Sequence, residues 1–346
     1  MKKFLTLVLV SFLALGLVAC GGEDGGEETA CKVKIGLVTD TGGVDDRSFN
    51  QSSWEGLLKY AEETNQKHCI NYLQSTAEAD YIPNLSQYAE DGYDMVIAVG
   101  FMFDKALAQV APMFPDTKFL FIDSFVDSPN VNSALFNAEQ GGYLVGLAAG
   151  LEAKNNGSNK IGFMGGVEMP TLQAFQAGYE QGALEANPDV TIYIDYADSF
   201  SDDAKGQQLA NKQYSEGATV VFQAAGNAGN GVIKEAKERG DVWAIGVDKD
   251  QYNDGVLDSG KSIILTSMLK RVDQVVYTTA MDLYNGVFEG GEHVFSLAND
   301  GVGFEATSGR NLSDETIEFI NGYAEKIKSG ELEVSPLPTI KNGSHN

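Results

Sequence analysis

The turn that follows the first predicted strand carries several side chains able to bind a small molecule. Residues 39–51 read TDTGGVDDRSFNQ and supply a carboxylate at Asp40, an aromatic ring at Phe49 and a carboxamide at Asn50. In open parallel sheets, ligands bind at the carboxyl ends of the strands. A carboxylate accepts hydrogen bonds from neighbouring hydroxyls, and a carboxamide both donates and accepts them. The turn therefore suits a small polyhydroxylated ligand that carries a flat ring.

Carboxylates, aromatic rings and glycines also follow the other predicted strands. They lie at residues 100–102, 123–125, 165–168, 198–200, 224–227, 248–250 and 266–270. These segments contain no histidine, no cysteine, no nucleophile beside a base and no phosphate-binding loop ending in Gly-Lys-Ser/Thr. The set therefore predicts binding rather than catalysis.

Each of these residues also has a purely structural interpretation. Asp40 could cap its turn, and Phe49 could belong to the core. Asp248 could be a turn residue and Lys270 a solvated lysine. Together they form a stronger pattern, because Phe49 and Phe200 could enclose a flat ring, and stacking on a base contributes about 1–3 kcal/mol. That geometry fits a nucleoside better than a bare sugar or an amino acid.

Short apolar runs alternate with amphipathic stretches from residue 32 onward, which is typical of parallel α/β sheets. The predicted strands form two series, 33–38, 70–74, 95–99, 118–122 and 131–136, then 160–164, 191–196, 219–222, 242–247 and 262–266. The predicted helices between them include 48–64, 83–91, 140–154, 172–186, 203–215 and 231–239. These strands are too many for one compact sheet in a chain of this length. We therefore expect two α/β lobes, each a parallel sheet flanked by helices.

The two lobes are expected to share the chain discontinuously. Residues 32–136 and about 266–298 are assigned to lobe one, and residues 137–265 and about 299–340 to lobe two. A long predicted helix at 271–288 returns the chain to lobe one, and a helix at 314–328 completes lobe two. Several crossovers between two lobes predict a hinged clamshell. The polar residues after Pro336 are expected to be loose.

The amino-terminal residues resemble an export signal. Lys2 and Lys3 precede an apolar run of 16 residues, shorter than the roughly 20 that span a membrane. Cys20 ends the sequence LVAC, which is similar to the lipobox of bacterial lipoproteins. The alternative is an ordinary secretory signal with a chance cysteine, but the position of Cys20 favours lipidation, with palmitate as an attached acyl chain. Residues 1–19 are assigned to the signal peptide and 20–31 to a lipidated, flexible tether.

The chain is strongly acidic. It has 49 aspartates and glutamates against 24 lysines and arginines, a net charge of −25. Nucleic-acid binding requires a basic surface, so this class of function is excluded. The charge also disfavours polyanionic ligands such as nucleotides.

Cys31 and Cys69 stand at the start of the first and second predicted strands. Strands one and two of a doubly wound sheet are usually neighbours, and disulfides persist outside the cytoplasm. The two cysteines are therefore either bridged or two unpaired thiols. With only three histidines and no cluster of cysteines and histidines, neither a metal site nor a cofactor is predicted.

Several separated blocks of the sequence carry a family resemblance. They are TDTGGVDDRSFNQ at 39–51 with WEG at 54–56, IGFMGG at 161–166, FQAGY at 175–179, SFSD at 199–202 with AKG at 204–206, AAG at 224–226, IGVDKDQ at 245–251 and TSMLK at 266–270. Together they are similar to the basic membrane protein family, in its purine-nucleoside-binding (PnrA-like) branch. Its members are substrate-binding lipoproteins of ABC importers with a periplasmic-binding-protein-like (type I) clamshell fold.

The resemblance implies a binder of purine nucleosides that works outside the cytoplasm as a monomer. A lipid would anchor it to a bacterial membrane, and its partners would be the permease and ATPase subunits of the importer. Four residues would contact the base by stacking or hydrogen bonding: Phe49, Asn50, Asp123 and Phe200. Four more would hold the ribose: Asp40, Gly226, Asp248 and Lys270.

Three other functions remain as alternatives. The same fold could bind another small polyhydroxylated ligand, or it could serve as a ligand sensor. The turn also resembles the calcium-binding motif of nucleoside hydrolases, Asp-Thr-Asp-Pro-Gly-x-Asp-Asp, but Thr41 stands where the second aspartate belongs and Asp40 where threonine belongs. Hard cations need several oxygen ligands, so this departure counts against a calcium-dependent hydrolase.

Overall fold

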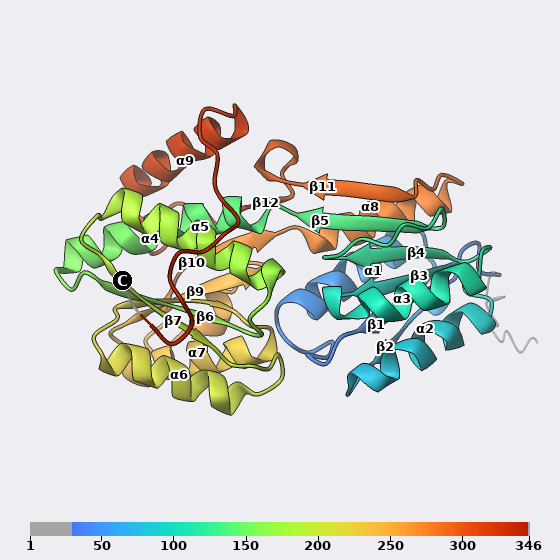
Figure 1. The fold of residues 1–346 in the computed structure, drawn as a ribbon, viewed down its shortest axis with the longest axis horizontal. Coiled ribbons are helices and arrows are strands. Elements are labelled where there is room, and N and C mark those ends of the chain that lie inside the picture. The colour runs from blue at the N-terminus through green and yellow to red at the C-terminus, as the bar shows by residue number, and fades with distance from the viewer. Residues whose placement is uncertain (1–29, 345–346) are drawn as a thin grey trace, which may run out of the picture. The chain divides into compact units, whose positions relative to one another are not determined.

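Two six-stranded sheets, one in each of two lobes, organise the protein (Figure 1). The structure is a computed structural model, and it describes residues 30–344. From Cys31 onward the chain forms one compact unit. Within residues 30–344, no helix has both the length and the apolar character needed to cross a membrane.

Lobe one is built on a parallel sheet with strand order β11-β5-β4-β3-β1-β2. Its strands are β1 (Ile35–Thr39), β2 (Ile70–Gln74), β3 (Met95–Val99), β4 (Lys118–Ile122), β5 (Val131–Phe136) and β11 (Gly291–Phe295). Its helices are α1 (Phe49–Glu63), α2 (Tyr81–Glu90), α3 (Asp104–Val110) and α8 (Val272–Tyr284). Every residue of β1 and β3 is buried, as expected for central parallel strands with both faces covered.

Lobe two repeats this plan with strand order β12-β10-β9-β8-β6-β7. Its strands are β6 (Lys160–Gly165), β7 (Thr191–Tyr196), β8 (Val220–Ala224), β9 (Trp243–Asp248), β10 (Ile264–Lys270) and β12 (Val302–Phe304), the last antiparallel to β10. Its helices are α4 (Ala138–Asn156), α5 (Pro170–Ala186), α6 (Asp203–Ser215), α7 (Asn227–Arg239) and α9 (Asp314–Lys328). Helices α4 and α5 approach closely at glycines, since a Cβ at Gly146 would lie 2.4 Å from the carbonyl oxygen of Tyr179.

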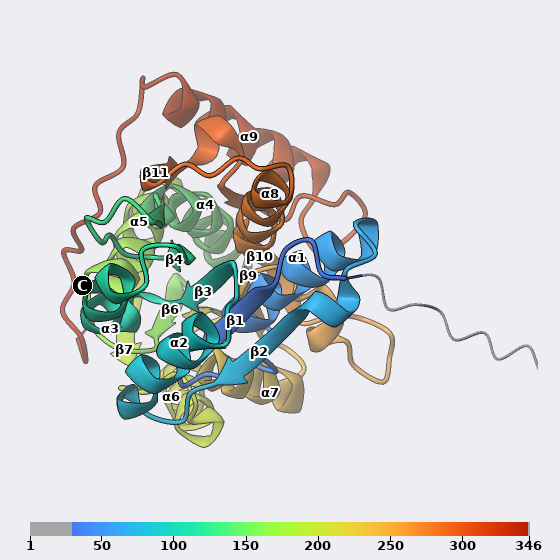
Figure 2. The ribbon, with the colours of Figure 1, turned by 90° about the vertical axis from the view of Figure 1, so that its right-hand side faces the viewer.

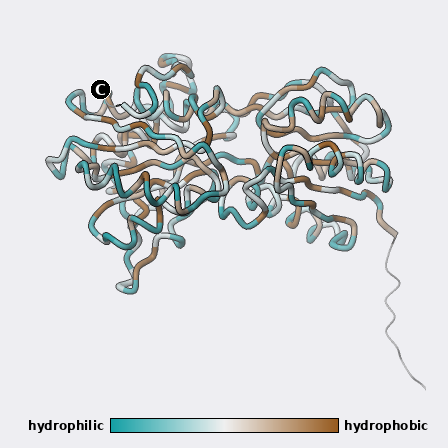
Figure 3. The backbone as a smooth tube through the Cα atoms, turned by 60° about the horizontal axis from the view of Figure 1, so that its bottom comes forward, coloured by the Kyte–Doolittle hydropathy of each residue, from teal (hydrophilic) through white to brown (hydrophobic). Residues whose placement is uncertain are grey.

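Hydropathy follows this two-lobed plan. The more hydrophobic stretches run through the interior of both lobes, and hydrophilic residues lie at the outer bends (Figure 3). Short 3₁₀ turns connect the main elements at Lys67–Cys69, Glu78–Asp80, Phe101–Phe103, Ala111–Met113, Tyr252–Gly255 and Leu297–Asn299.

The chain passes between the lobes at three places. It leaves lobe one between β5 and α4, returns between β10 and α8, and leaves again between β11 and β12. The sequence predicts the return near residue 266, but residues 266–270 belong to lobe two, because β10 runs to Lys270 and pairs with β9 and β12. The sequence pattern also misses β11 and β12. Strand β11 is half-exposed along its length and β12 has three residues, so neither shows a long apolar run.

The start of lobe one is tied together covalently. Strands β1 and β2 lie side by side in parallel (Figure 2). A disulfide joins Cys31 to Cys69, whose Cα atoms are 5.6 Å apart. Of the two possibilities that the sequence leaves open, the structure has the bridge. Cys20 and the proposed signal peptide lie outside the described residues.

The carboxyl-terminal tail is not loose, contrary to the expectation from its polar composition. It crosses lobe two from α9 to the edge strand β7 (Figure 1). There the amide of Gly343 donates to the carbonyl of Ile194 at 2.7 Å, and the amide of Ile194 donates to Ser344 at 3.1 Å. The buried carboxylate of Glu180 accepts from the backbone amide and the hydroxyl of Thr339 at 2.8 and 2.9 Å. These partners, together with Ile340 packed against the core of lobe two, fix a segment of mainly polar sequence.

Candidate functional site

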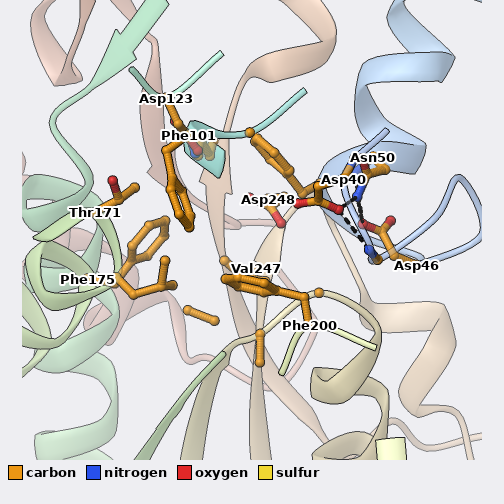
Figure 4. A pocket seen from close by; sticks show the side chains of 18 residues that line it. Asp40, Asp46, Asn50, Phe101, Asp123, Thr171, Phe175, Phe200, Val247 and Asp248 are labelled. Atoms are coloured by element: carbon orange, nitrogen blue, oxygen red, sulfur yellow. Dashed lines mark hydrogen bonds and ion pairs between the residues drawn. The ribbon is translucent and has the colours of Figure 1, made fainter. Parts of the chain in front are cut away.

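A pocket lies between the two lobes at the carboxyl ends of their strands (Figure 4). The space among its lining residues measures about 500 Å³, including a part that is open to solvent. All eight residues predicted to bind a ligand line it: Asp40, Phe49, Asn50, Asp123, Phe200, Gly226, Asp248 and Lys270. Ten further lining residues complete the wall: Gly42, Asp46, Gly100, Phe101, Thr171, Leu172, Phe175, Ala224, Ala225 and Val247. The prediction that ligands bind at the carboxyl ends of strands, here called the strand-end rule, therefore identified residues that lie together in the fold.

Asp40 is held by donors from its own turn. It directly follows β1, and its side chain is buried. Its Oδ1 accepts from the backbone amide of Gly42 and from Nδ2 of Asn50, both at 2.8 Å. Burial raises the pKa of Asp40 to about 7, although these hydrogen bonds act in the opposite direction. The ligand-free pocket thus holds a carboxyl group that exchanges its proton near neutral pH.

Asp46 lies two residues before Ser48, the N-cap of α1, and holds the start of that helix. Its carboxylate accepts from the backbone amides of Ser48, Asn50 and Gln51 at 2.9, 2.8 and 3.1 Å, which are donors that the first turn of α1 leaves unpaired. Its side chain is fully buried, and burial raises its pKa. Asp46 therefore fixes the start of α1, and with it the direction of Phe49.

Asn50 connects the two carboxylates. Its Nδ2 donates to Asp40 at 2.8 Å and to Asp46 at 2.9 Å, and its Oδ1 accepts from the backbone amide of Asp40 at 3.3 Å. The sequence predicts that Asn50 bonds to a base. In the structure its polar atoms hold the turn together (Figure 4). Asn50 thus positions Asp40 and Asp46, whichever ligand the pocket takes.

Asp248 is the carboxylate that lobe two contributes. It ends β9 in a left-handed conformation, with φ of 67°, and is buried. Its carboxylate accepts from the hydroxyl of Ser48, which belongs to lobe one. Burial raises the pKa of Asp248 to about 6, and the neighbouring charge of Lys270 and the bond from Ser48 limit the rise.

Lys270 is the one cation among the residues that line the pocket. It ends β10, and its ammonium pairs with the carboxylate of Asp123 from lobe one. The two side chains are 2 and 7% exposed. The ammonium also lies 4.6 Å from the ring centre of Phe49 and 4.9 Å from that of Phe136. Such contacts stabilise a desolvated cation.

Aromatic rings form the apolar part of the wall. The ring of Phe200 in lobe two lies 6.2 Å from that of Phe101 in lobe one, in an edge-to-face arrangement. Phe175 approaches from a third side (Figure 4). Phe101, which follows β3, is thus the ring of lobe one that Phe200 contacts. Phe49 lines the same pocket, and the enclosure of a flat ring by Phe49 and Phe200 stays a prediction.

Three lining residues of α5 were not predicted: Thr171, Leu172 and Phe175. They escape the strand-end rule because they lie inside the first turns of a helix. Two signals were available. Pro170 marks the first helical position, and residues 171 and 175 are four apart, so they face the same side.

The lining residues combine four carboxylates, one ammonium and four phenylalanines. They include no histidine, cysteine or serine. Carboxylates accept hydrogen bonds from hydroxyls, and the rings can stack on a flat heterocycle. The excess of negative charge opposes a phosphate group.

A separate cluster has the spacing of metal ligands. Within the described residues, Cys31, His68 and Cys69 form the one group of three or more histidine, cysteine or acidic ligand atoms that lie close enough for an ion. The two sulfur atoms are bonded to each other, so a single imidazole remains. None of the three lines the pocket.

Residues 32–337 match the family described as PnrA-like ABC transporter substrate-binding proteins. The chain is 38% identical to a CD4+ T-cell-stimulating antigen of Listeria innocua, over 97% of this chain and 99% of that protein. It is 40% identical to the ABC transporter nucleoside-binding protein BmpA of Lactococcus lactis subsp. cremoris, over 87% of this chain and 91% of that protein.

Among solved structures, the fold is similar to an ABC transporter solute-binding protein of Aeropyrum pernix K1. The TM-score is 0.76 and the sequence identity 27%, over 87% of this chain and 92% of that one. Both kinds of comparison therefore lead to solute-binding proteins with two α/β lobes.

Proposed function

The chain belongs to the family of PnrA-like ABC transporter substrate-binding proteins, and from that premise we propose that it captures purine nucleosides between its lobes and delivers them to a membrane permease. Members of this family are extracytoplasmic binding components of transporters, not enzymes. The family assignment sets aside the calcium-dependent hydrolase that the sequence of the turn leaves as an alternative. The identity of the ligand is our proposal.

One observation carries the proposal: carboxylates and aromatic rings from both lobes line the same pocket. The carboxylates of Asp40 and Asp248 accept hydrogen bonds from ribose hydroxyls, and Lys270 donates to ribose oxygens. Phe49 and Phe200 cover the base, and Asp123 accepts from its polar edge. The relative in Lactococcus lactis is named as a nucleoside-binding protein, which supports the same ligand class.

Selectivity follows from the same groups. A buried polar group left without a partner costs about 1–3 kcal/mol, so a ligand without ribose hydroxyls binds less tightly. A 5′-phosphate would bring negative charge beside four carboxylates and one ammonium. We therefore expect nucleosides to bind in preference to nucleotides and free bases.

A thermal-shift screen tests the proposal. It compares adenosine, guanosine and inosine with pyrimidine nucleosides, free bases, ribose and a purine nucleotide, because a ligand that binds the folded state raises the Tm. We expect the largest rise with a purine nucleoside. A larger rise with ribose or with another sugar alone would replace the nucleoside by a different polyhydroxylated ligand.

We also propose that a lipid on Cys20 holds the protein at the membrane. The sequence LVAC after an apolar run supports this anchor. The variant Cys20→Ala should move from the membrane fraction to the soluble fraction of expressing cells. Retention of the variant at the membrane would contradict the proposed anchor.

A further inference from the structure

We propose that a group of contacts beside the pocket, here called the latch, holds the lobes closed and sets how long a ligand stays. This inference rests on the proposed function only for the identity of that ligand. The latch joins the segment from Asp46 to Glu55 in lobe one to four residues of lobe two: Asn230, Lys249, Gln251 and Asp254. These four do not line the pocket, so they act through the position of the lobes.

The lobe-one side of the latch presents two backbone carbonyls to lobe two. The side chain of Asp46 turns inward and binds three amides of its own segment. Arg47 has a φ of 59°, a conformation that residues other than glycine rarely adopt. The carbonyl oxygens of Asp46 and Arg47 accept from lobe two, from Nδ2 of Asn230 and Nε2 of Gln251, each at 3.1 Å.

The lobe-two side is fixed before it meets lobe one. The side chain of Gln251 is buried, and its Oε1 accepts from the backbone amide of Val247 and from Nε2 of Gln223, both at 2.9 Å. These two bonds orient the side chain so that its Nε2 faces the carbonyl oxygen of Arg47. Asn230 is held through the same nitrogen that reaches lobe one, because its Nδ2 also donates to Oδ1 of Asn227 at 2.9 Å. Two oriented amide groups thus meet two oriented carbonyls when the lobes close.

Opposite charges add a second set of contacts around these hydrogen bonds. The ammonium of Lys249 lies 2.7 Å from the carboxylate of Glu55, and the guanidinium of Arg47 lies 3.8 Å from Asp254. The side chains of Lys249 and Glu55 are 27 and 44% exposed, so water reaches this pair.

The position of the latch explains why it acts on closure. The crossovers leave lobe one at β5 and β11, at one edge of its sheet, whereas the latch segment follows β1, near the opposite edge. In Figure 1 the loop between β1 and α1 reaches the boundary with lobe two beside α7. Each latch contact joins different lobes, so its loss leaves the packing within each lobe intact.

A charge-reversal cycle on the full-length protein tests the latch. Lys249→Glu and Glu55→Lys each place like charges across the lobes. Each should raise the dissociation rate of inosine about three- to tenfold, as expected for a partly exposed ion pair turned into a repulsion. The double variant restores the attraction, and its dissociation rate should return to within about twofold of the parent. Lys67→Glu is the matched control, because Lys67 pairs with Glu62 at 2.7 Å within lobe one.

A second measurement needs no ligand. Spin labels at the exposed residues Gln109 in α3 and Gln208 in α6 report the distance between the lobes. Each single reversal should shift the ligand-free distances to larger values, and the double variant should shift them back. Unchanged distances in both single variants would overturn the latch. If no nucleoside binds the parent protein, the proposed function is wrong. The spin-label distances then still test whether the latch holds the lobes closed.

Discussion

The two halves of the pocket are built in different ways. In lobe one, Asp40, Asp46 and Asn50 lie in a single turn and bind one another and the amides of that turn. In lobe two, Asp248 and Lys270 end separate strands, and their side chains find partners across the cleft, at Ser48 and Asp123. The turn of lobe one is therefore complete within its own lobe, whereas the charged groups of lobe two are paired with residues of the other lobe.

This difference separates stability from binding. Groups that are paired within one lobe contribute to the folding of that lobe in open and closed forms alike. Groups that are paired only across the cleft contribute to closure and to ligand contact. We therefore expect substitutions in the turn of lobe one to lower the free energy of unfolding, and substitutions at the strand ends of lobe two to lower affinity.

The largest effect is expected for Asn50→Leu. It removes the donor shared by two buried carboxylates, and hydrogen bonds to charged groups contribute about 1.5–3 kcal/mol each. The free energy of unfolding in urea should fall by about 3 kcal/mol. Asn84→Leu is the control, since Asn84 makes a single hydrogen bond at 3.1 Å, to Ser75. An equal decrease in the free energy of unfolding for both variants would contradict a stabilising role of this turn.

Asp248→Ala should lower nucleoside affinity ten- to hundredfold, because a ligand loses about 1.5–3 kcal/mol with a charged acceptor. Calorimetric titration measures the affinity, and a thermal scan should show a nearly unchanged Tm. Asp198→Ala is a close control, because Asp198 also has a positive φ, of 54°, but is exposed outside the pocket. If Asp248→Ala lowers the free energy of unfolding as much as Asn50→Leu does, the two halves do not differ as we describe.

Phe200→Ala should weaken binding about tenfold, the effect of losing one stacked ring at about 1–3 kcal/mol. The same titration measures it, with Phe319→Ala as the control on an exposed ring of α9. The loss of affinity should be smaller for ribose, which has no base to stack on the ring. An equal loss for ribose would assign Phe200 to closure through its contact with Phe101.

The carboxyl groups make both stability and affinity depend on pH, in opposite directions. Burial raises the pKa of Asp40 to about 7 and that of Asp248 to about 6, against 3.8 for an ordinary aspartate. The folded state therefore holds more protons than the unfolded chain between about pH 4 and 7, and the stability that these groups contribute falls as pH rises through that range.

Ribose hydroxyls favour the ionised carboxylates, so nucleoside affinity should fall several-fold as pH drops from 8 to 5. Calorimetry across this range measures the change. Asp40→Asn should remove the step near pH 7, and Asp248→Asn the step near pH 6. An affinity that rises at low pH would mean that the protonated carboxyls donate to the ligand instead.

The turn of lobe one, with Asp40, Phe49 and Asn50, could be predicted from the sequence because its residues are neighbours in the chain. Asp248, Lys270 and Phe200 are readable because parallel strands end at one edge of a sheet. The ion pair between Lys270 and Asp123 could not be predicted from the sequence, because it depends on how far the two lobes close. Thr171 and Phe175 lie in α5, where their spacing places them on one face. The direction of that face is set by packing on α4, which the local sequence does not show.

Two parts of the fold were also not predicted, because they depend on contacts between distant parts of the chain. Strand β11 alternates exposed and half-buried residues, because it lies at an edge of its sheet, so it lacks the apolar run that marks central strands. The carboxyl-terminal tail is polar, but Glu180, which is buried in α5, supplies its anchor from a distant part of the chain.

That tail also acts on how the protein behaves among its neighbours. An uncovered edge strand offers free amides and carbonyls to any other chain, which is a common route to aggregation. Residues Gly343 and Ser344 bond these groups at Ile194 on β7, one of the two edge strands of lobe two. If the proposed lipid anchor holds the protein at a membrane, copies of it lie close to one another on that surface. Gly343 and Ser344 therefore cover the amide and the carbonyl of Ile194, so another chain cannot pair with β7 at this residue.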